Sequence, residues 1–269
     1  MKLNYRKFGQ GHPLIIVHGL YGSSDNWITI GKALAENFEV YIVDQRNHGS
    51  SPHAEEHTYR AMMEDLKIFM DDHQLNKAIL LGHSMGGKTV MFFAAEHPER
   101  VTSLVVIDIA PKNYSTVSDY APKTIDHVNI VNTMLNFDFS GFKTRTEIDK
   151  KLAENIHSPK VRQFLLKNLK RKEDKSFGWK LNTSAIHSHL PEIMDGMNGE
   201  DFSMGRGITG FPILFIRGEN SNYIREEDHK LIRTIFPYAE ITNIPNAGHW
   251  VHAEQPNLLV KTVEYFVLD

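Results

Sequence analysis

A serine flanked by glycines is the most chemically informative feature of this 269-residue sequence. Ser84 lies in the segment 82–87 (GHSMGG), which follows a predicted strand and precedes the amphipathic stretch 88–97. Glycines on both sides of a serine permit a tight strand-to-helix turn that lifts the hydroxyl above the edge of a sheet. The short pattern alone is weak, because Gly and Ser are common. The strand before it and the helix after it make Ser84 a candidate nucleophile.

A second segment could stabilise the negative charge that develops when a carbonyl carbon becomes tetrahedral. Residues 18–22 (HGLYG) follow the first buried strand, where a loop can supply a backbone donor. We expect the N–H groups of Leu20 and Met85 to be the oxyanion donors, each contributing roughly 2.7–4 kcal/mol. His18 is interpreted as a structural histidine that bonds a loop carbonyl rather than as a catalytic group.

The candidate general base is His249, in the segment 244–250 (IPNAGHW) near the C-terminus. This segment is predicted to join a short strand to the last helix, where a base could reach over Ser84. The chain has 15 histidines, and most of them are expected to be surface or structural residues. His249 differs because it completes the chain order serine, acid, histidine.

The acid that would orient His249 is the least obvious member of the set. The loop 217–223 (RGENSNY) would ordinarily present an Asp, yet it places Ser221 there. A serine cannot stabilise an imidazolium with a full charge. Asp108, at the end of the neighbouring strand, is the natural replacement, and Ser221 would add a hydrogen bond. Two alternatives stay open: Glu219 bends in as the acid, or Asp108 only caps the first turn of the segment that follows it.

Further residues are assigned roles around this set. His83 beside the nucleophile and the aromatic residues Trp179 and Trp250 are the candidates for substrate binding, although aromatic residues are more often plain core. Asp44 is expected to fix its loop by pairing with Arg46. The chemistry requires no metal and no organic cofactor, and neither is expected.

The elements that would position these residues follow an alternating pattern. Short β-branched runs alternate with longer amphipathic stretches, which is typical of a mostly parallel sheet covered by helices. Polar residues gather where the runs end, and in open α/β sheets that edge is where ligands bind. Strands are predicted at 14–17, 40–43, 78–81, 104–107 and 213–216.

The strand pattern stops between Asp108 and Phe211, where the sequence reads mainly as helices. We therefore expect a helical cap at 111–207, inserted into a core made of residues 1–110 and 208–269. The charged run 167–175 (KNLKRKEDK) is interpreted as a solvated helix end. Cap helices are predicted at 123–135, 145–156, 159–172 and 185–194.

Composition narrows the classes of function. The chain is 41% hydrophobic and 23% charged, with a net charge of −3. It therefore has no excess of positive charge that would attract the phosphate backbone of a nucleic acid, and no nucleic acid partner is expected. The absence of Cys excludes disulfides, thiolate metal sites and a Cys nucleophile. We find no secretory signal, no stretch that could span a bilayer and no strongly basic apolar helix. A soluble, cytoplasmic protein without stable membrane association is expected.

Taken together, the motifs resemble those of the α/β-hydrolase superfamily and, more narrowly, of the YbfF-like bacterial esterases. The resemblance spans nearly the whole chain, and its narrower part rests on the segments 44–51 (DQRNHGSS), 107–111 (IDIAP) and 217–221 (RGENS). It implies an α/β-hydrolase fold, a triad whose acid follows the sixth strand, an accompanying serine on the next strand, and esterase activity that can extend to acyl-CoA thioesters. These roles fall on Ser84, Asp108, His249 and Ser221.

The sequence thus predicts a serine hydrolase that cleaves small carboxylic esters or acyl thioesters through an acyl-enzyme on Ser84. Because Ser rather than Asp occupies the turn, the alkyl-carboxylate chemistry of dehalogenases and epoxide hydrolases is not expected. A carbon–carbon bond hydrolase, a perhydrolase and a small-ligand-binding protein without turnover remain alternatives. Acyl-chain length, ester or thioester preference, the physiological substrate and the oligomeric state are left open.

Overall fold

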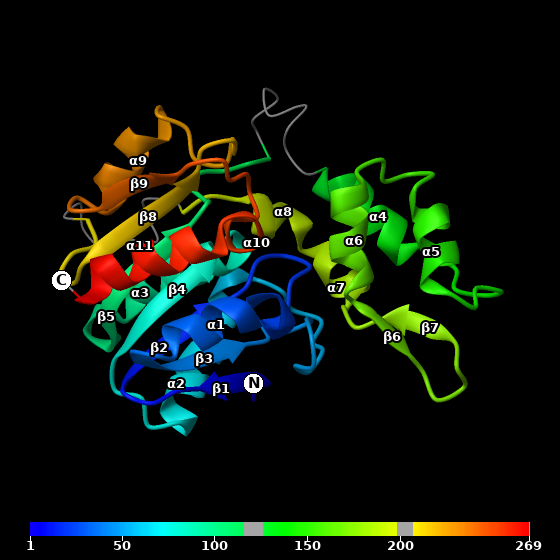
Figure 1. Cartoon of the computed structure of the whole chain (residues 1–269), viewed down its shortest axis with the longest axis horizontal. Coiled ribbons are helices and arrows are strands. Elements are labelled where there is room, and N and C mark those ends of the chain that lie inside the picture. The colour runs from blue at the N-terminus through cyan, green and yellow to red at the C-terminus, as the bar shows by residue number, and fades with distance from the viewer. Residues whose placement is uncertain (116–125, 198–206, 269) are drawn as a thin grey trace.

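The computed structural model describes residues 1–115, 126–197 and 207–268, and a seven-stranded sheet lies at its centre (Figure 1). The strand order is β1-β3-β2-β4-β5-β8-β9, and every neighbouring pair is parallel except β1 with β3. The five predicted strands and the mostly parallel sheet are confirmed. The strands span Tyr5–Phe8 (β1), His12–Val17 (β2), Phe38–Val43 (β3), Ala78–His83 (β4), Val101–Ile107 (β5), Ile213–Gly218 (β8) and Glu240–Ile244 (β9).

Helices cover both faces of the sheet, because its central strands are apolar on both sides. Along β2, Ile15 and Val17 pack in one apolar cluster with α2 and α3, whereas Leu14 and Ile16 pack in another with α1 and α11. The helices of the core are η1 (Ser24–Trp27), α1 (Ile28–Leu34), α2 (Tyr59–Asp72), α3 (Met85–Glu96), η2 (Pro98–Arg100), α9 (Asp228–Ile235), α10 (Val251–Glu254) and α11 (Pro256–Leu268).

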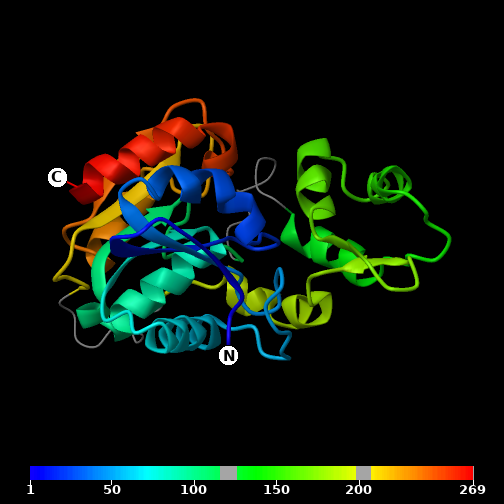
Figure 2. The same cartoon turned by 60° about the horizontal axis from the view of Figure 1, so that its bottom comes forward.

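A second group of helices lies to one side of the sheet, at the right of Figure 1, and Figure 2 shows the same separation from another direction. We call residues 126–197 the cap. Its apolar cluster also includes Leu20 and Met85 of the core. The domain bounds 1–110, 208–269 and 111–207 stay a prediction, since 116–125 and 198–206 lie outside the described residues. The cap contains α4 (His127–Leu135), α5 (Arg145–Leu152), α6 (Pro159–Leu166), β6 (Leu169–Arg171), β7 (Phe177–Trp179), α7 (Thr183–Ser188) and α8 (Leu190–Met194).

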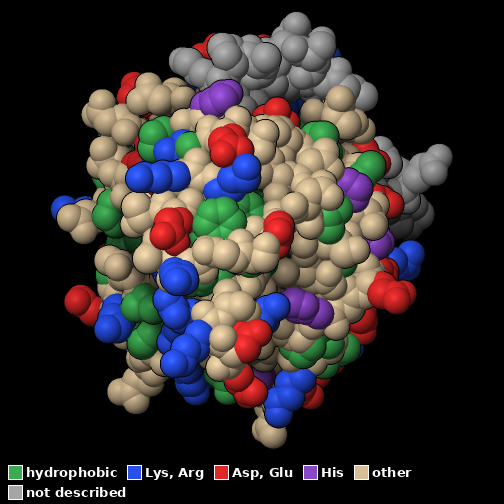
Figure 3. All heavy atoms as spheres, turned by 90° about the vertical axis from the view of Figure 1, so that its right-hand side faces the viewer, with side chains coloured by type: hydrophobic (Ala, Val, Ile, Leu, Met, Phe, Trp, Pro, Cys, Tyr) green, Lys and Arg blue, Asp and Glu red, His purple; other side chains and the backbone are tan. Residues whose placement is uncertain are grey.

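The predicted helix 159–172 is wrong beyond residue 166, because the chain turns there into the antiparallel hairpin of β6 and β7. Leu169, Phe177 and Trp179 are buried, and a spacing of two between the last two indicates a strand rather than a helix. The charged run is solvated as expected, but on a hairpin: Lys170 and Lys172 are exposed. Figure 3 views the cap side of the molecule, where Lys and Arg side chains are interspersed with Asp and Glu.

Three other cap helices differ from their predicted bounds. The helix predicted at 145–156 ends at Leu152. The helix predicted at 185–194 is divided at His189 into α7 and α8, because Pro191 has no N–H with which to continue the helical hydrogen bonds. The first cap helix begins at His127; the predicted residues 123–125 lie outside the described part of the chain.

Lys88, on α3, connects the helix that follows Ser84 to both chain segments at the base of the cap. Its Nζ donates to the backbone carbonyls of Lys112, at 3.1 Å, and of Asp195. The ammonium also lies 4.9 Å from the centre of the Tyr114 ring. Burial lowers the pKa of Lys88 to about 7, because the ammonium loses its hydration.

We therefore expect the free energy of unfolding to rise more steeply between pH 7 and 9 in the unaltered protein than in Lys88→Met. The unfolded chain keeps this proton up to the ordinary lysine pKa of 10.5, whereas the folded chain releases it above about 7. The unfolded state then binds more protons, and stability increases with pH by at most about 1.4 kcal/mol per pH unit. Urea unfolding at several pH values measures this, and equal slopes would contradict it.

Candidate active site

Ser84 lies on a sharp turn between β4 and α3. Its φ of 53° and ψ of −121° are rare for a residue with a side chain. The turn depends on its glycines: a Cβ on Gly82 would lie 2.3 Å from the carbonyl oxygen of Gly86, and one on Gly86 would lie 2.2 Å from that of Val17. The strand-to-helix turn predicted from the sequence is therefore present, and it holds Ser84 at the carboxyl end of β4.

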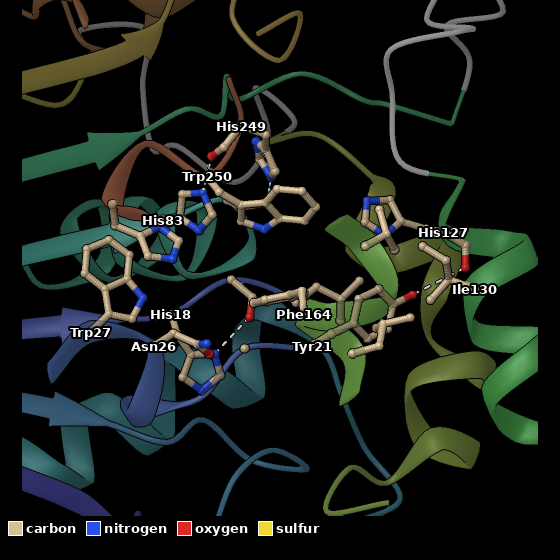
Figure 4. Close-up of a pocket in the computed structure, with 17 residues that line it drawn as sticks. His18, Tyr21, Asn26, Trp27, His83, His127, Ile130, Phe164, His249 and Trp250 are labelled. Atoms are coloured by element: carbon tan, nitrogen blue, oxygen red, sulfur yellow. Dashed lines mark hydrogen bonds between the residues drawn. The ribbon is translucent and has the colours of Figure 1, made fainter. Parts of the chain in front are cut away.

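Two further loops bring Asp108 and His249 to Ser84. Asp108 directly follows β5, the fifth strand along the chain rather than the sixth that the resemblance implied, and has a φ of 51°. His249 lies in the loop between β9 and α10, at the edge of the cavity shown in Figure 4. Its Nε2 is 3.1 Å from Ser84 Oγ, and its Nδ1 is 2.8 Å from Asp108 Oδ2. The three side chains thus form one continuous hydrogen-bonded relay.

Asp108 rather than Glu219 contacts the imidazole. The Asp108 carboxylate is buried and also accepts hydrogen bonds from the hydroxyl of Ser221 and, at 3.0 Å, from the N–H of Gly218. Glu219 Oε2 instead accepts the N–H of Asn246 at 2.9 Å. Ser221 therefore binds the carboxylate from the adjacent strand end, where the sequence suggested that an acid would ordinarily lie.

Burial sets the protonation of the relay. It lowers the pKa of His249 and raises that of Asp108, because each group loses the water that would stabilise its charge. The donors from Ser221 and Gly218 oppose this change and lower the pKa of Asp108. The His249 imidazole is uncharged at neutral pH, so its Nε2 can accept a proton from Ser84.

Hydrogen bonds within the loop 18–22 determine the direction of one backbone donor. The carbonyl of Gly19 accepts the N–H of Gly22 at 2.9 Å and the Nδ1–H of His18 at 2.9 Å. The C=O and N–H of one trans peptide unit point in opposite directions. The N–H of Leu20 is therefore directed to the other side of the loop. His18 thus bonds a loop carbonyl, as predicted.

Two unpaired N–H groups lie next to Ser84. Neither the N–H of Leu20 nor that of Met85, the first residue of α3, has a hydrogen-bond partner within the described part of the chain. The loop packs closely against the nucleophile, since a Cβ on Gly19 would lie 3.1 Å from that of Ser84. Such an arrangement can hold an oxygen that becomes negatively charged next to the serine.

A cavity between the core and the cap adjoins the relay. His83 and Trp250, two of the predicted substrate-binding residues, line it together with Phe164 of the cap (Figure 4). Trp179 lies elsewhere: its Nε1–H donates to the carbonyl of Met134 at 2.9 Å, inside the cap. His83 Nε2 is 2.8 Å from the carbonyl of His249, so it also holds the backbone of the histidine loop.

Ser84 also lines a second cavity. Met85, Tyr59 and Lys88 contribute to its walls. Ser84 and His127 of α4 line both spaces. Ser84 therefore borders two mainly apolar cavities.

Sequence reasoning missed Tyr223, whose ring stacks on the imidazole of His249. The two ring centres are 3.8 Å apart and the planes differ by 17°. Tyr223 is anchored through its N–H to Ser221 Oγ (3.2 Å), through its carbonyl to the Tyr114 hydroxyl (2.6 Å) and through its own hydroxyl to His127 Nε2 (3.2 Å). Its position two residues after Ser221 was the signal in the sequence.

The predicted pair of Asp44 with Arg46 is wrong. Arg46 instead binds Asp65 of α2, with its Nε 2.6 Å from one carboxylate oxygen and its Nη2 3.0 Å from the other. Asp44 does fix its loop, but through the backbone N–H groups of Ser24 (2.6 Å) and Ser50 (2.9 Å). These partners are backbone N–H groups, so the spacing of charged residues along the sequence did not reveal them.

Comparison with known proteins agrees with this geometry. Residues 12–256 match the family model described as the alpha/beta hydrolase fold. The chain belongs to this family. The fold class and the resemblance to the YbfF-like esterases are confirmed: Esterase YbfF of Escherichia coli is 33% identical over 274 residues, which cover 100% of both chains.

Two further relatives are also named as hydrolases of esters or lipids. The sn-1-specific diacylglycerol lipase ABHD11 of Mus musculus is 36% identical over 256 residues, or 94% of this chain and 80% of its own length. The structure named marine microorganism esterase superposes with a TM-score of 0.92 at 44% identity, over 99% of each chain. These names support a hydrolase assignment for this α/β-hydrolase.

Within residues 1–115, 126–197 and 207–268, no group of three or more His, Asp or Glu side chains is arranged to hold a metal ion. No helix in the same ranges is both long and apolar enough to cross a membrane.

Proposed function

We propose that the protein is a serine hydrolase of small carboxylic esters or acyl thioesters, with Ser84 as nucleophile, His249 as general base and Asp108 as the acid that orients it. The observation that supports this most strongly is the relay, in which Nε2 of one imidazole is 3.1 Å from Ser84 Oγ and its Nδ1 is 2.8 Å from Asp108. Ser221 supports the carboxylate of Asp108.

In the first half of the proposed cycle, His249 accepts the Ser84 proton as Oγ attacks the carbonyl carbon of the substrate. The carbonyl oxygen becomes an oxyanion that accepts hydrogen bonds from the N–H groups of Leu20 and Met85. Removing one such donor typically lowers kcat by a factor of roughly 10²–10³. His249 then gives its proton to the leaving alcohol or thiol. The carbon–oxygen or carbon–sulfur bond breaks, and the acyl group stays on Ser84.

In the second half, water replaces the leaving group. His249 removes one proton from the water as its oxygen attacks the acyl carbon, and it then protonates Ser84 Oγ as the acid product departs. Throughout, Asp108 holds the imidazole tautomer that leaves Nε2 free and stabilises the imidazolium. Two mainly apolar cavities, each lined in part by Ser84, adjoin the place where the two halves of the ester would bind.

Fluorophosphonate labelling followed by substrate kinetics tests the proposal. We expect a stoichiometric adduct on Ser84, and turnover of aryl esters and acyl-CoAs across a series of acyl lengths. If Ser84 is labelled but the protein turns over only diketones, the carbon–carbon bond hydrolase is favoured. If the protein forms peracids faster than it hydrolyses esters, the perhydrolase is favoured. The absence of any adduct would favour a small-ligand-binding protein.

The stack between Tyr223 and His249 leads to a further prediction. Tyr223→Leu should lower kcat/KM about tenfold, because an aromatic stack contributes about 0.5–1.5 kcal/mol and the imidazole loses a guide to its orientation. Tyr223→Phe keeps the stack and should retain most of the rate. Kinetics and melting temperatures of the two variants provide the measurement. Equal losses in both would show that the hydroxyl, not the ring face, matters.

A further inference from the structure

Tyr21, the residue after the predicted oxyanion donor Leu20, is bonded at its N–H, its carbonyl and its side chain. Its N–H donates to Nε2 of the buried His48 at 3.2 Å. Its carbonyl accepts the side-chain amide of Asn168 at 2.8 Å, and its hydroxyl donates to the carbonyl of His127 at 3.3 Å. His48 belongs to the core, whereas Asn168 and His127 belong to the cap.

These bonds matter because Tyr21 has a backbone conformation that favours glycine, with a φ of 61°. Holding a residue that has a side chain in such a sparsely populated backbone conformation costs roughly 1–3 kcal/mol of stability. The conformation persists only when the surrounding structure fixes it. Two of its three anchors come from the cap. If they were lost, Tyr21 could leave this conformation, and the turn that brings the Gly22 N–H to the Gly19 carbonyl would open. The peptide unit that carries the Leu20 N–H would then keep only its bond to His18, and the N–H would be less firmly directed.

Asn168 is itself held rigidly. It lies between α6 and β6, where its N–H donates to the carbonyl of Leu165 at 2.9 Å and its carbonyl accepts the N–H of Lys180 at 2.8 Å. Its side chain is buried. A buried amide on a fixed backbone donates in one direction, and here that direction is the carbonyl of Tyr21.

We propose that Asn168 is a positioning residue for the oxyanion hole, so that the cap completes the catalytic site as well as enclosing it. The cap amide holds Tyr21 in its strained conformation, and this keeps the Leu20 N–H directed at the developing oxyanion. The inference rests on the proposed function, in which Leu20 is one of the two donors. Asn168 acts through Tyr21 and Leu20 and does not touch the substrate.

The test compares binding of the tetrahedral state with binding of the substrate. Ser84 Oγ adds to the carbonyl of an aryl trifluoromethyl ketone, its proton passes to His249, and the resulting alkoxide occupies the oxyanion hole. In Asn168→Leu, which lacks the donor, we expect kcat to fall on the order of tenfold to a hundredfold. The Ki of the ketone should rise by the same factor, while KM for the matching ester stays within about twofold. Asn168→Ser, a smaller change, provides the same comparison if the leucine variant folds poorly.

Asn182 offers a matched control, because it is another cap amide that bonds the core. Its Nδ2 donates to the carbonyl of Ala54 at 3.0 Å and to Asn47 Oδ1 at 3.1 Å, and neither of these residues bonds Tyr21. Asn182→Ser keeps a residue that can cap the N-terminus of α7 while it removes this amide. We expect it to leave the ratio between ketone Ki and ester KM unchanged.

Several results would overturn the inference. Asn168 variants that match Asn182→Ser in kcat and in ketone Ki would show that Asn168 only fastens the cap to the core. The same conclusion would follow if KM and Ki rose together while kcat stayed constant. Failure of the proposed function is a distinct result, because the unaltered protein would then neither label at Ser84 nor hydrolyse esters.

Discussion

Ser84→Ala is expected to lower kcat for ester hydrolysis by on the order of 10⁶, with little change in KM. The substitution removes the one oxygen that lies 3.1 Å from His249 Nε2. It leaves both spaces around that position lined as before. The residual rate would come from substrate binding and from the two backbone donors, which would stabilise the oxyanion formed when water attacks the carbonyl carbon directly.

Stopped assays at high enzyme concentration, with mass spectrometry of fluorophosphonate-treated protein, would measure this loss. Ser221 provides an internal control for the label, because it is a second buried serine at the site whose hydroxyl is bonded to Asp108. The adduct should appear on Ser84 and be absent from Ser221. A variant without Ser84 that still turned over esters at a normal rate would refute the nucleophile assignment.

The positions of Ser84 and Asp108 at the edge of the sheet could be predicted, because backbone geometry and strand order determine them. Gly82 and Gly86 are required by close contacts with neighbouring backbone atoms, so the turn at Ser84 follows from local sequence. Asp108 could be found because β4, β5 and β8 are adjacent parallel strands whose carboxyl ends meet at one edge. These inferences needed only strand order and turn geometry.

The contribution of the cap could not be predicted in the same way. Asn168 lies in a segment that sequence periodicity assigned to a helix, and its bond to Tyr21 spans 147 residues of sequence. The stack of Tyr223 on His249 likewise depends on how two loops pack. Such contacts depend on where side chains point once the cap is packed against the core. The periodic spacing of hydrophobic residues along the sequence does not predict them.

Asp108→Asn is expected to lower kcat by about 10⁴, with the geometry of the site nearly unchanged. The carboxylate accepts hydrogen bonds from His249 Nδ1, Ser221 and Gly218, so it fixes the proton on Nδ1 and leaves Nε2 to face Ser84. An amide that turns its NH₂ toward Nδ1 would favour the opposite tautomer, in which Nε2 carries the proton and cannot act as a base. It would also provide no charge to balance the imidazolium.

Two neighbouring substitutions separate this effect from a general disturbance of the site. Glu219→Gln should leave kcat nearly unchanged, since its carboxylate bonds the N–H of Asn246 rather than His249. The loss of kcat in Ser221→Ala should lie between those in Glu219→Gln and Asp108→Asn. A hydrogen bond to a charged group contributes about 1.5–3 kcal/mol, which corresponds to roughly a ten- to a hundredfold change in rate. A large loss in Glu219→Gln together with a small one in Asp108→Asn would transfer the role of the acid to Glu219, and the inferred tautomer control by Asp108 would be wrong.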